Sequence, residues 1–370
     1  MEIDKKTSLK ISWIQFTSAI VIIFDHCFDY IDYEHAEKGI FESIIYFLSR
    51  MLNKGLPYCA MAVFFFLSSF LLYKDWNEKK DLKTWYIKRI KSRFKSIIIP
   101  YLLWNLIWTV LFLGVGLLDK SNLTNITGNP EIKDLINGIL FAKYNEVFWF
   151  MKTLIIYIII SPLIGILITK LNYLTLVLGF GLSVIPNLFT GELLIFANFY
   201  NLFFWFLGTY LSINYASVNN KIKSMLHNKK DLFDYLTLIV SLVLITYIQG
   251  SDIKQRVSYF VRLLLNCTVL ISSIIGSTCF YDIVSHFLGK KTVKWYTKTS
   301  FLIYAIHKPV EQVFNKVVAK LFAASLGAHL LNLFGGTLFT LTVVLVTIYV
   351  MGKIVPKTTL ILNGGRKIFD

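Results

Sequence analysis

Long apolar runs follow one another along almost the whole chain. Ten of them have roughly 17 to 25 residues, the length that an α-helix needs to cross the hydrocarbon core of a membrane. None alternates polar and apolar residues with a period of two, so the pattern predicts helices and not a membrane β-barrel. The ten runs lie at residues 11–28, 57–73, 94–118, 147–168, 173–189, 193–213, 232–248, 257–281, 296–314 and 330–352.

Two further stretches, residues 40–52 and 132–141, are amphipathic and too short to cross. We expect them to lie along the membrane surface. No polar block between the runs is long enough to fold alone. The pattern therefore predicts an all-α integral membrane protein, with residues 1–370 forming one membrane domain, a single bundle of about ten transmembrane helices.

Composition agrees with this pattern. Hydrophobic residues make up 55% of the chain and charged residues only 16%, and the mean hydropathy is +0.60. A soluble globular protein needs more polar surface than this. The four cysteines stand singly, without metal or redox spacing, so we expect small core residues and no metal site.

The distribution of Lys and Arg predicts the orientation. Lys5, Lys6 and Lys10 precede the first run, and no small-residue cleavage site follows it, so we expect a retained anchor. With this end inside, 25 of the 38 Lys and Arg residues fall on cytoplasmic segments and 10 on the other side. This asymmetry predicts that both termini are cytoplasmic. It also accounts for the net charge of +16 without nucleic acid, because basic segments meet anionic membrane lipid.

Ionisable side chains in or just beyond the predicted membrane helices mark a candidate site, because hydrocarbon disfavours them. Under this topology they fall near the outer ends of their helices, which suggests a site open to the outer face. Each also has a plainer reading. A histidine at a helix end can be an interfacial residue, and Lys or Arg can extend to the interface. The residues are His26, Asp29, Lys152, Arg262, His307 and Glu311.

Residues 74–95 carry nine Lys and Arg on the predicted inner face. Such a cluster suits phosphate groups, either of lipid headgroups or of a nucleotide-bearing donor. It can equally be only the anchor that sets the topology.

Several strings in order along the chain carry a family resemblance. They are ISWIQFTSAIVIIFDH at residues 11–26, FFFLSSFLL at 64–72, the basic run into Pro100 and Tyr101, FWFMKTL at 148–154, FFWFLGTYL at 203–211 and TSFLIYAIHKPV at 299–310. With these strings the chain resembles the membrane-bound acyltransferase 3 family, bacterial multi-span enzymes that move acyl groups onto surface glycans and related acceptors. Some members carry a fused extracytoplasmic domain; this sequence shows none after the last run.

The family pairs an arginine with a histidine eleven residues later in its first span. Gln15 and His26 occupy these positions here. At 100° and 1.5 Å per residue the two lie on one helix face, roughly 16 Å apart. Gln15 can hydrogen-bond but supplies no fixed charge. Ser69 also departs from the family, which commonly has Gly there.

The resemblance implies acyl transfer in the bacterial cytoplasmic membrane, with no bound cofactor. Acyl-CoA, most simply acetyl-CoA, is the implied donor, and a hydroxyl of a cell-surface polysaccharide or other glycan is the implied acceptor. A neutral imidazole suits removal of the hydroxyl proton, so His26 is the candidate general base. Asp29, three residues on and on the same face, can orient it. Arg89 and Arg93 are candidates for the donor's phosphates. Gln15, Lys152, Arg262, His307 and Glu311 are further candidates for contact with donor or acceptor, and His307 with Glu311 can pair across one turn.

A membrane translocator or export component for a glycan or lipid-linked intermediate is the alternative. His26 and Arg262 would then line a path. Carriers typically have internal repeats with broken helices at corresponding positions. The prolines inside the predicted spans do not correspond in this way, which favours the enzyme.

Overall fold

The computed structural model describes residues 5–27, 38–76, 81–118, 131–185, 199–214, 231–251, 253–289, 291–292 and 294–369. Over these residues the chain is helical and has no strand, which confirms the predicted all-α class. The helices are α1 (Lys5–His26), α2 (Ile40–Arg50), α3 (Leu56–Tyr73), α4 (Leu82–Arg93), α5 (Ile99–Leu118), α6 (Ile132–Phe141), α7 (Trp149–Ile159), α8 (Ser161–Leu171), α9 (Leu174–Val184), α10 (Leu202–Ile213), α12 (Asp231–Gly250), α13 (Ile253–Arg256), α14 (Tyr259–Leu288), α15 (Ser300–Leu321), α16 (Leu326–Leu330), α17 (Gly336–Ile354) and α18 (Pro356–Leu362).

Six helical segments of the described chain are long and apolar enough to cross a membrane, and α7 with α8, bent by 63°, can make a seventh. The six are Thr7–His26, Ile40–Tyr73, Leu82–Gly114, Phe233–Gly250, Tyr259–Leu288 and Leu326–Ile354. These helices fit a multi-pass membrane protein. The predicted spans at residues 173–189 and 193–213 are represented by the shorter α9 and α10, and residues 186–198 lie outside the described part. Helix α15 coincides with the predicted span 296–314. It is not one of the six candidate membrane spans, because its C-terminal half carries several charged residues.

The predicted break between a surface helix at residues 40–52 and a span at residues 57–73 is wrong. Helices α2 and α3 are joined by a π-helical turn, Met51–Gly55, into one segment of 34 residues. A second π-helical turn, Phe94–Ile98, joins α4 to α5 in the same way. In each case a proline, Pro57 or Pro100, follows the turn, where the wider winding accommodates a residue without an N–H. Within the first of these turns, Asn53 is fully buried. The other predicted short helix, at residues 132–141, is α6.

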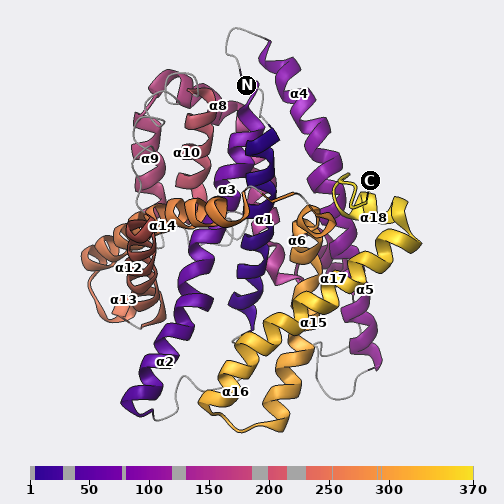
Figure 1. Cartoon of the computed structure of the whole chain (residues 1–370). Coiled ribbons are helices and arrows are strands. Elements are labelled where there is room, and N and C mark those ends of the chain that lie inside the picture. The colour runs from indigo at the N-terminus through magenta and orange to yellow at the C-terminus, as the bar shows by residue number, and fades with distance from the viewer. Residues whose placement is uncertain are drawn as a thin grey trace.

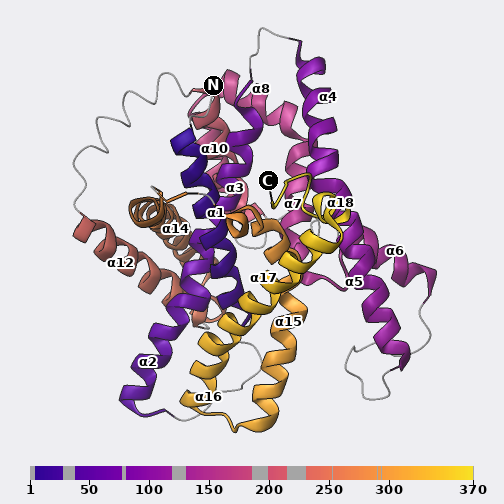
Figure 2. The same cartoon turned by 45° about the vertical axis from the view of Figure 1, so that its right-hand side comes forward.

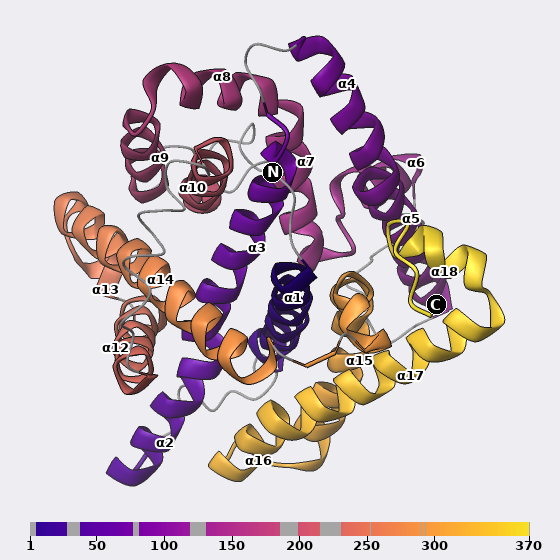
Figure 3. The same cartoon turned by 45° about the horizontal axis from the view of Figure 1, so that its top comes forward.

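Helix α1 occupies the centre of the bundle. It contacts α3, α14, α15 and α17, and Figure 3 shows it enclosed by these helices. An apolar helix without a polar face is typical of such a position. Trp13 anchors its first half, because the indole N–H donates to the Lys291 carbonyl at 3.2 Å.

Helix α14 crosses α1 steeply. It lies across the bundle in Figure 1 and is seen nearly end-on in Figure 2, whereas α1 stays upright in both views. The depth of Arg262, which was predicted from the order of the spans, stays a prediction. The lipid-facing surface is clear elsewhere: α12 and α17 expose large apolar side chains, among them Phe233, Val240, Tyr247, Leu338 and Val346.

Helices α3 and α10 approach closely at Gly208. A Cβ on Gly208 would overlap the Ser69 hydroxyl and the Phe66 carbonyl. Ser69 is fully buried and donates to Phe66 O at 3.0 Å. A small residue at a helix interface permits such contact in membranes. The glycine of this contact is Gly208 of α10, and Ser69 of α3 lies against it.

We predict that Gly208→Ala lowers stability by roughly 1–3 kcal/mol, because the added methyl group must push two helices apart. Thermal unfolding of the detergent-purified protein measures the change. Gly181→Ala is the matched control, since a Cβ on Gly181 in α9 meets nothing within 4 Å. Equal melting temperatures for the two variants would contradict the close approach.

Candidate active site

Two histidines from distant parts of the chain meet beside α1. His26 is the last residue of α1, and His307 is fully buried in α15. Their ring centroids are 5.3 Å apart and the planes are inclined by 35°. The structure thus brings together two of the residues singled out from the sequence.

The partners of His307 define its protonation. Its Nδ1 lies 2.9 Å from the Tyr304 carbonyl oxygen and 3.1 Å from that of Ile303. Because carbonyl oxygens only accept, Nδ1 carries the proton of the neutral ring and Nε2 carries the lone pair. Nε2 is buried and has no hydrogen-bond partner within the described part of the chain. His307 therefore holds an open proton-accepting nitrogen away from water.

A charged pair on α15 supports His26. Lys308 Nζ lies 3.3 Å from Glu311 Oε2 and 3.4 Å from His26 Nδ1. Asn315 donates one amide hydrogen bond to Glu311 and another, at 3.3 Å, to the His26 carbonyl. The sequence interpretation paired Glu311 with His307; in the structure the fully buried Glu311 carboxylate meets Lys308 and Asn315. Asp29, the predicted orienting carboxylate, lies outside the described residues.

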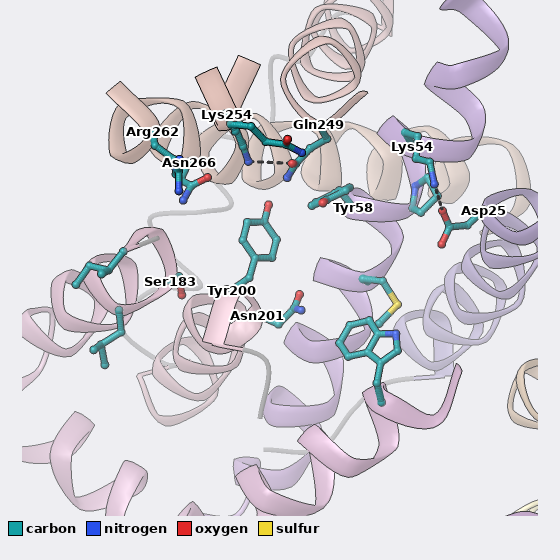
Figure 4. Close-up of a pocket in the computed structure, with 16 residues that line it drawn as sticks. Asp25, Lys54, Tyr58, Ser183, Tyr200, Asn201, Gln249, Lys254, Arg262 and Asn266 are labelled. Atoms are coloured by element: carbon teal, nitrogen blue, oxygen red, sulfur yellow. Dashed lines mark hydrogen bonds and ion pairs between the residues drawn. The ribbon is translucent and has the colours of Figure 1, made fainter. Parts of the chain in front are cut away.

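A wide cavity of about 840 Å³ begins next to this cluster, at Asp25. Figure 4 shows Asp25 and Lys54 at one end, Lys254, Arg262 and Asn266 at the other, and Tyr200 and Asn201 between them. Asp25 pairs with Lys54 at 3.9 Å. The polar and aromatic residues of its wall are Asp25, Lys54, Tyr58, Trp149, Ser183, Tyr200, Asn201, Gln249, Lys254, Gln255, Arg262 and Asn266.

The far end of the wide cavity is cationic. Lys254 Nζ donates to Gln249 Oε1 at 2.8 Å. Burial and the neighbouring charge of Arg262 lower the pKa of Lys254 to about 8. Two positive groups are therefore held near each other at this end.

A narrow cavity of about 100 Å³ runs along the other half of α1. Gln15, Arg93 and Arg366 supply its most polar groups, and the Arg93 and Arg366 guanidiniums are close enough to repel each other. The rest of its wall is largely apolar: Met61, Phe64, Leu71, Ile97, Phe150, Met151, Leu154, Ile158, Trp205, Phe301 and Tyr304, with Ser68, Ser96 and Ser300.

The imidazole pair lines neither cavity, but each ring has a neighbour that does. His26 follows Asp25, which lines the wide one, and the His307 ring lies 6.1 Å from that of Tyr304, which lines the narrow one. Met61 lines both cavities, so the two meet at this side chain.

The other five residues predicted from the sequence differ in which cavity they line, if any. Gln15 and Arg93 line the narrow cavity, and Arg262 lines the wide one. Lys152 and Arg89 line neither of these two cavities; Arg89 instead pairs with Asp75 at 2.6 Å. The described residues contain no group of three or more His, Cys, Asp or Glu side chains that could hold a metal ion.

Sequence reasoning missed Lys308, Asn315, Lys254 and Arg366 as site residues. The spacing of Lys308 and Glu311, three residues apart on one helix, was a usable signal. For Arg366 no such signal exists, because its neighbour Arg93 is far away in the sequence.

The chain matches a family described as an acyltransferase domain, acyltransferase 3, over residues 9–352. It belongs to the acyltransferase 3 family. The match confirms the resemblance seen in the sequence and includes every site residue above except Arg366. No curated protein and no solved structure matches the chain. Membership of the acyltransferase 3 family supports acyl transfer in general.

We predict that Lys308→Met lowers the stability of this acyltransferase 3 protein by about 3 kcal/mol, because it removes a cation from the buried Glu311 carboxylate. The double variant Lys308→Met/Glu311→Leu should recover part of this loss. Thermal unfolding in detergent measures both. If the double variant is no more stable than Lys308→Met alone, the ion pair does not carry the proposed energy.

Proposed function

We propose that the protein transfers an acyl group, most simply acetyl, from cytoplasmic acyl-CoA to a hydroxyl of a cell-surface polysaccharide or other glycan. The observation that carries this proposal is the imidazole pair of His26 and His307, whose neighbours Asp25 and Tyr304 line two cavities of different character, one wide and polar, the other narrow and largely apolar. An acyltransferase must bring a thioester and an alcohol to one base from two directions. The proposed setting is the bacterial cytoplasmic membrane.

The narrow cavity suits the donor. Arg93 and Arg366 provide two guanidiniums at one end, which can bind the phosphates of CoA through charge-assisted hydrogen bonds. The apolar wall beyond them suits an acyl group and the thin arm that carries it. Arg93 ends the basic helix α4, and we propose that this end, like both termini, faces the cytoplasm, as the distribution of Lys and Arg predicts.

The wide cavity suits the acceptor. It lies at the opposite end of α1, and its rings and amides can bind a sugar. Gln15, on the narrow cavity, and Asp25, on the wide one, lie ten residues apart, about 15 Å along α1. Tyr304, which lines the narrow cavity one turn before His307, lies where the thioester must arrive.

His26 is the proposed general base. It is partly exposed, next to the wide cavity, whereas His307 is fully buried. Lys308 reaches His26 Nδ1 at 3.4 Å, at the long end of the hydrogen-bond range, so an acceptor hydroxyl can take this contact over. His26 accepts the hydroxyl proton as the oxygen attacks the thioester carbonyl, the C–S bond breaks, and the imidazolium returns the proton to the CoA thiolate.

Lys308 and His307 assist this step. The Lys308 ammonium, displaced from Nδ1, remains close enough to stabilise the negative charge that develops on the carbonyl oxygen. His307 packs against His26. Because its Nδ1–H is held by two backbone carbonyls, the His307 ring is a neutral neighbour of His26.

We predict that His26→Ala lowers the rate of acyl transfer at least 100-fold, the usual contribution of a positioned general base. Transfer of radiolabelled acetyl from acetyl-CoA to cell-surface glycan, in membranes that contain equal amounts of each variant, measures this rate. His286→Ala, at an exposed position of α14, should keep wild-type activity. Wild-type transfer by His26→Ala would remove the proposed base.

We predict that Arg93→Gln raises the KM for acetyl-CoA about tenfold and changes kcat little, because a charge-assisted hydrogen bond to phosphate is lost before chemistry begins. Lys88→Gln, at an exposed position of the same helix, is the charge-matched control. An unchanged KM for Arg93→Gln would place the donor elsewhere.

A translocator for a glycan or lipid-linked intermediate is the second candidate, and one observation favours it. Helices α7 and α8 meet at a bend of 63°, the kind of broken span found in carriers. No second bent pair of this kind occurs among the described helices, so no repeated half is visible. Glycan movement across vesicle membranes without acyl-CoA would support this candidate against the enzyme.

A further inference from the structure

We propose that the wide cavity selects an anionic acceptor: a polyhydroxylated unit that carries an oxyanion, carboxylate or phosphate, bound between Lys254 and Arg262. This inference rests on the proposed function, since it names the class of acceptor that the same site takes. It concerns the end of the cavity away from the imidazole pair.

The charge balance of the cavity wall is the first argument. Among the described residues of the wall, Lys54, Lys254 and Arg262 carry three positive charges and Asp25 carries one negative charge. Asp25 lies 3.9 Å from Lys54, at the same end. Within the described part of the chain, Lys254 and Arg262 have no carboxylate partner, so two positive charges remain to be matched.

The position of these two cations is the second argument. They come from different helices, α13 and α14, and lie near each other at one end of the cavity. The protein partner of the Lys254 ammonium is the neutral amide of Gln249. Arg262 Nε is buried and has no hydrogen-bond partner among the described residues. An oxyanion between the two would accept hydrogen bonds from both and remove their repulsion.

The remainder of the wall favours a sugar over a simple ion. Tyr58, Tyr200 and Trp149 present rings to the cavity. Asn201 Oδ1 is buried without a partner in the described structure and can accept from a hydroxyl. Asn266 donates through Nδ2 to the Val184 carbonyl, which holds its amide in a fixed orientation beside Arg262.

The layout in Figure 4 determines the direction in which the acceptor would lie in the cavity. Lys254 and Arg262 lie at one end of the cavity, and Asp25, next to His26, lies at the other. An acceptor anchored by its oxyanion at the cationic end presents a hydroxyl from its far end to the base. The acylated hydroxyl is thus separated from the anionic group by the length of the cavity.

The test compares matched acceptors with purified full-length protein in nanodiscs. Trigalacturonate and its carboxyl-reduced counterpart form one pair, and phosphorylated maltotriose and maltotriose form the other. We expect each anionic member to have a KM at least tenfold lower than its neutral counterpart. The pair with the larger difference identifies carboxylate or phosphate as the preferred oxyanion.

Variants locate the effect. Arg262→Gln and Lys254→Gln should each raise the KM for the anionic acceptors about tenfold and leave the neutral ones unchanged, while Arg262→Lys should restore part of the selectivity. Lys357→Gln, exposed and outside the wide cavity, is the control. Equal KM values for charged and neutral acceptors, or variants that affect both alike, would overturn the inference and leave acyl transfer intact.

A binding measurement separates this inference from the proposed function. Calorimetric titration of the His26→Ala protein with the same four saccharides, without acyl-CoA, requires no chemistry. Preference for the anionic saccharides that is lost in Arg262→Gln supports the inference even where transfer is not observed. Equal binding of all four overturns it.

Discussion

The ion pair between Lys308 and Glu311 is the interaction on which the rest of the site depends. A carboxylate as deeply buried as Glu311 is tolerated only beside a cation and hydrogen-bond donors, and Lys308 with Asn315 provides them. The same two residues contact the ring and the carbonyl of His26. These contacts offset the cost of burying the Glu311 carboxylate in α15. They also hold the C-terminal end of α1 in place.

Much of the site was visible in the sequence because hydrocarbon makes ionisable residues conspicuous. His26, His307, Glu311 and Arg262 stand out in apolar runs, and the structure brings the first three into one cluster and places Arg262 on the cavity beside it. The all-α class and the family followed from the same runs. What could not be read was geometry between helices: the steep crossing of α14, or the meeting of Arg93 with Arg366. Nor does the amphipathic pattern of residues 40–52 reveal that a π-helical turn continues this helix into the next apolar run, which is why one long helix was divided into two.

The surroundings of Gln15 bear on its difference from the arginine that the resemblance implies at this position. Gln15 faces the narrow cavity, where Arg93 and Arg366 already concentrate positive charge. A third guanidinium would add to that repulsion, whereas an amide can contact a donor without it. In this chain the positive charge at the narrow cavity comes from Arg93 of α4 and Arg366 of the C-terminal segment.

Met61 carries a consequence for the membrane itself. It lines both cavities, and on the proposed topology these open toward opposite sides. On that proposal Met61 stands between a cavity that opens to the cytoplasm and one that opens outward. Its side chain is flexible and apolar, so it can yield to an acyl chain and still hinder the passage of water and protons.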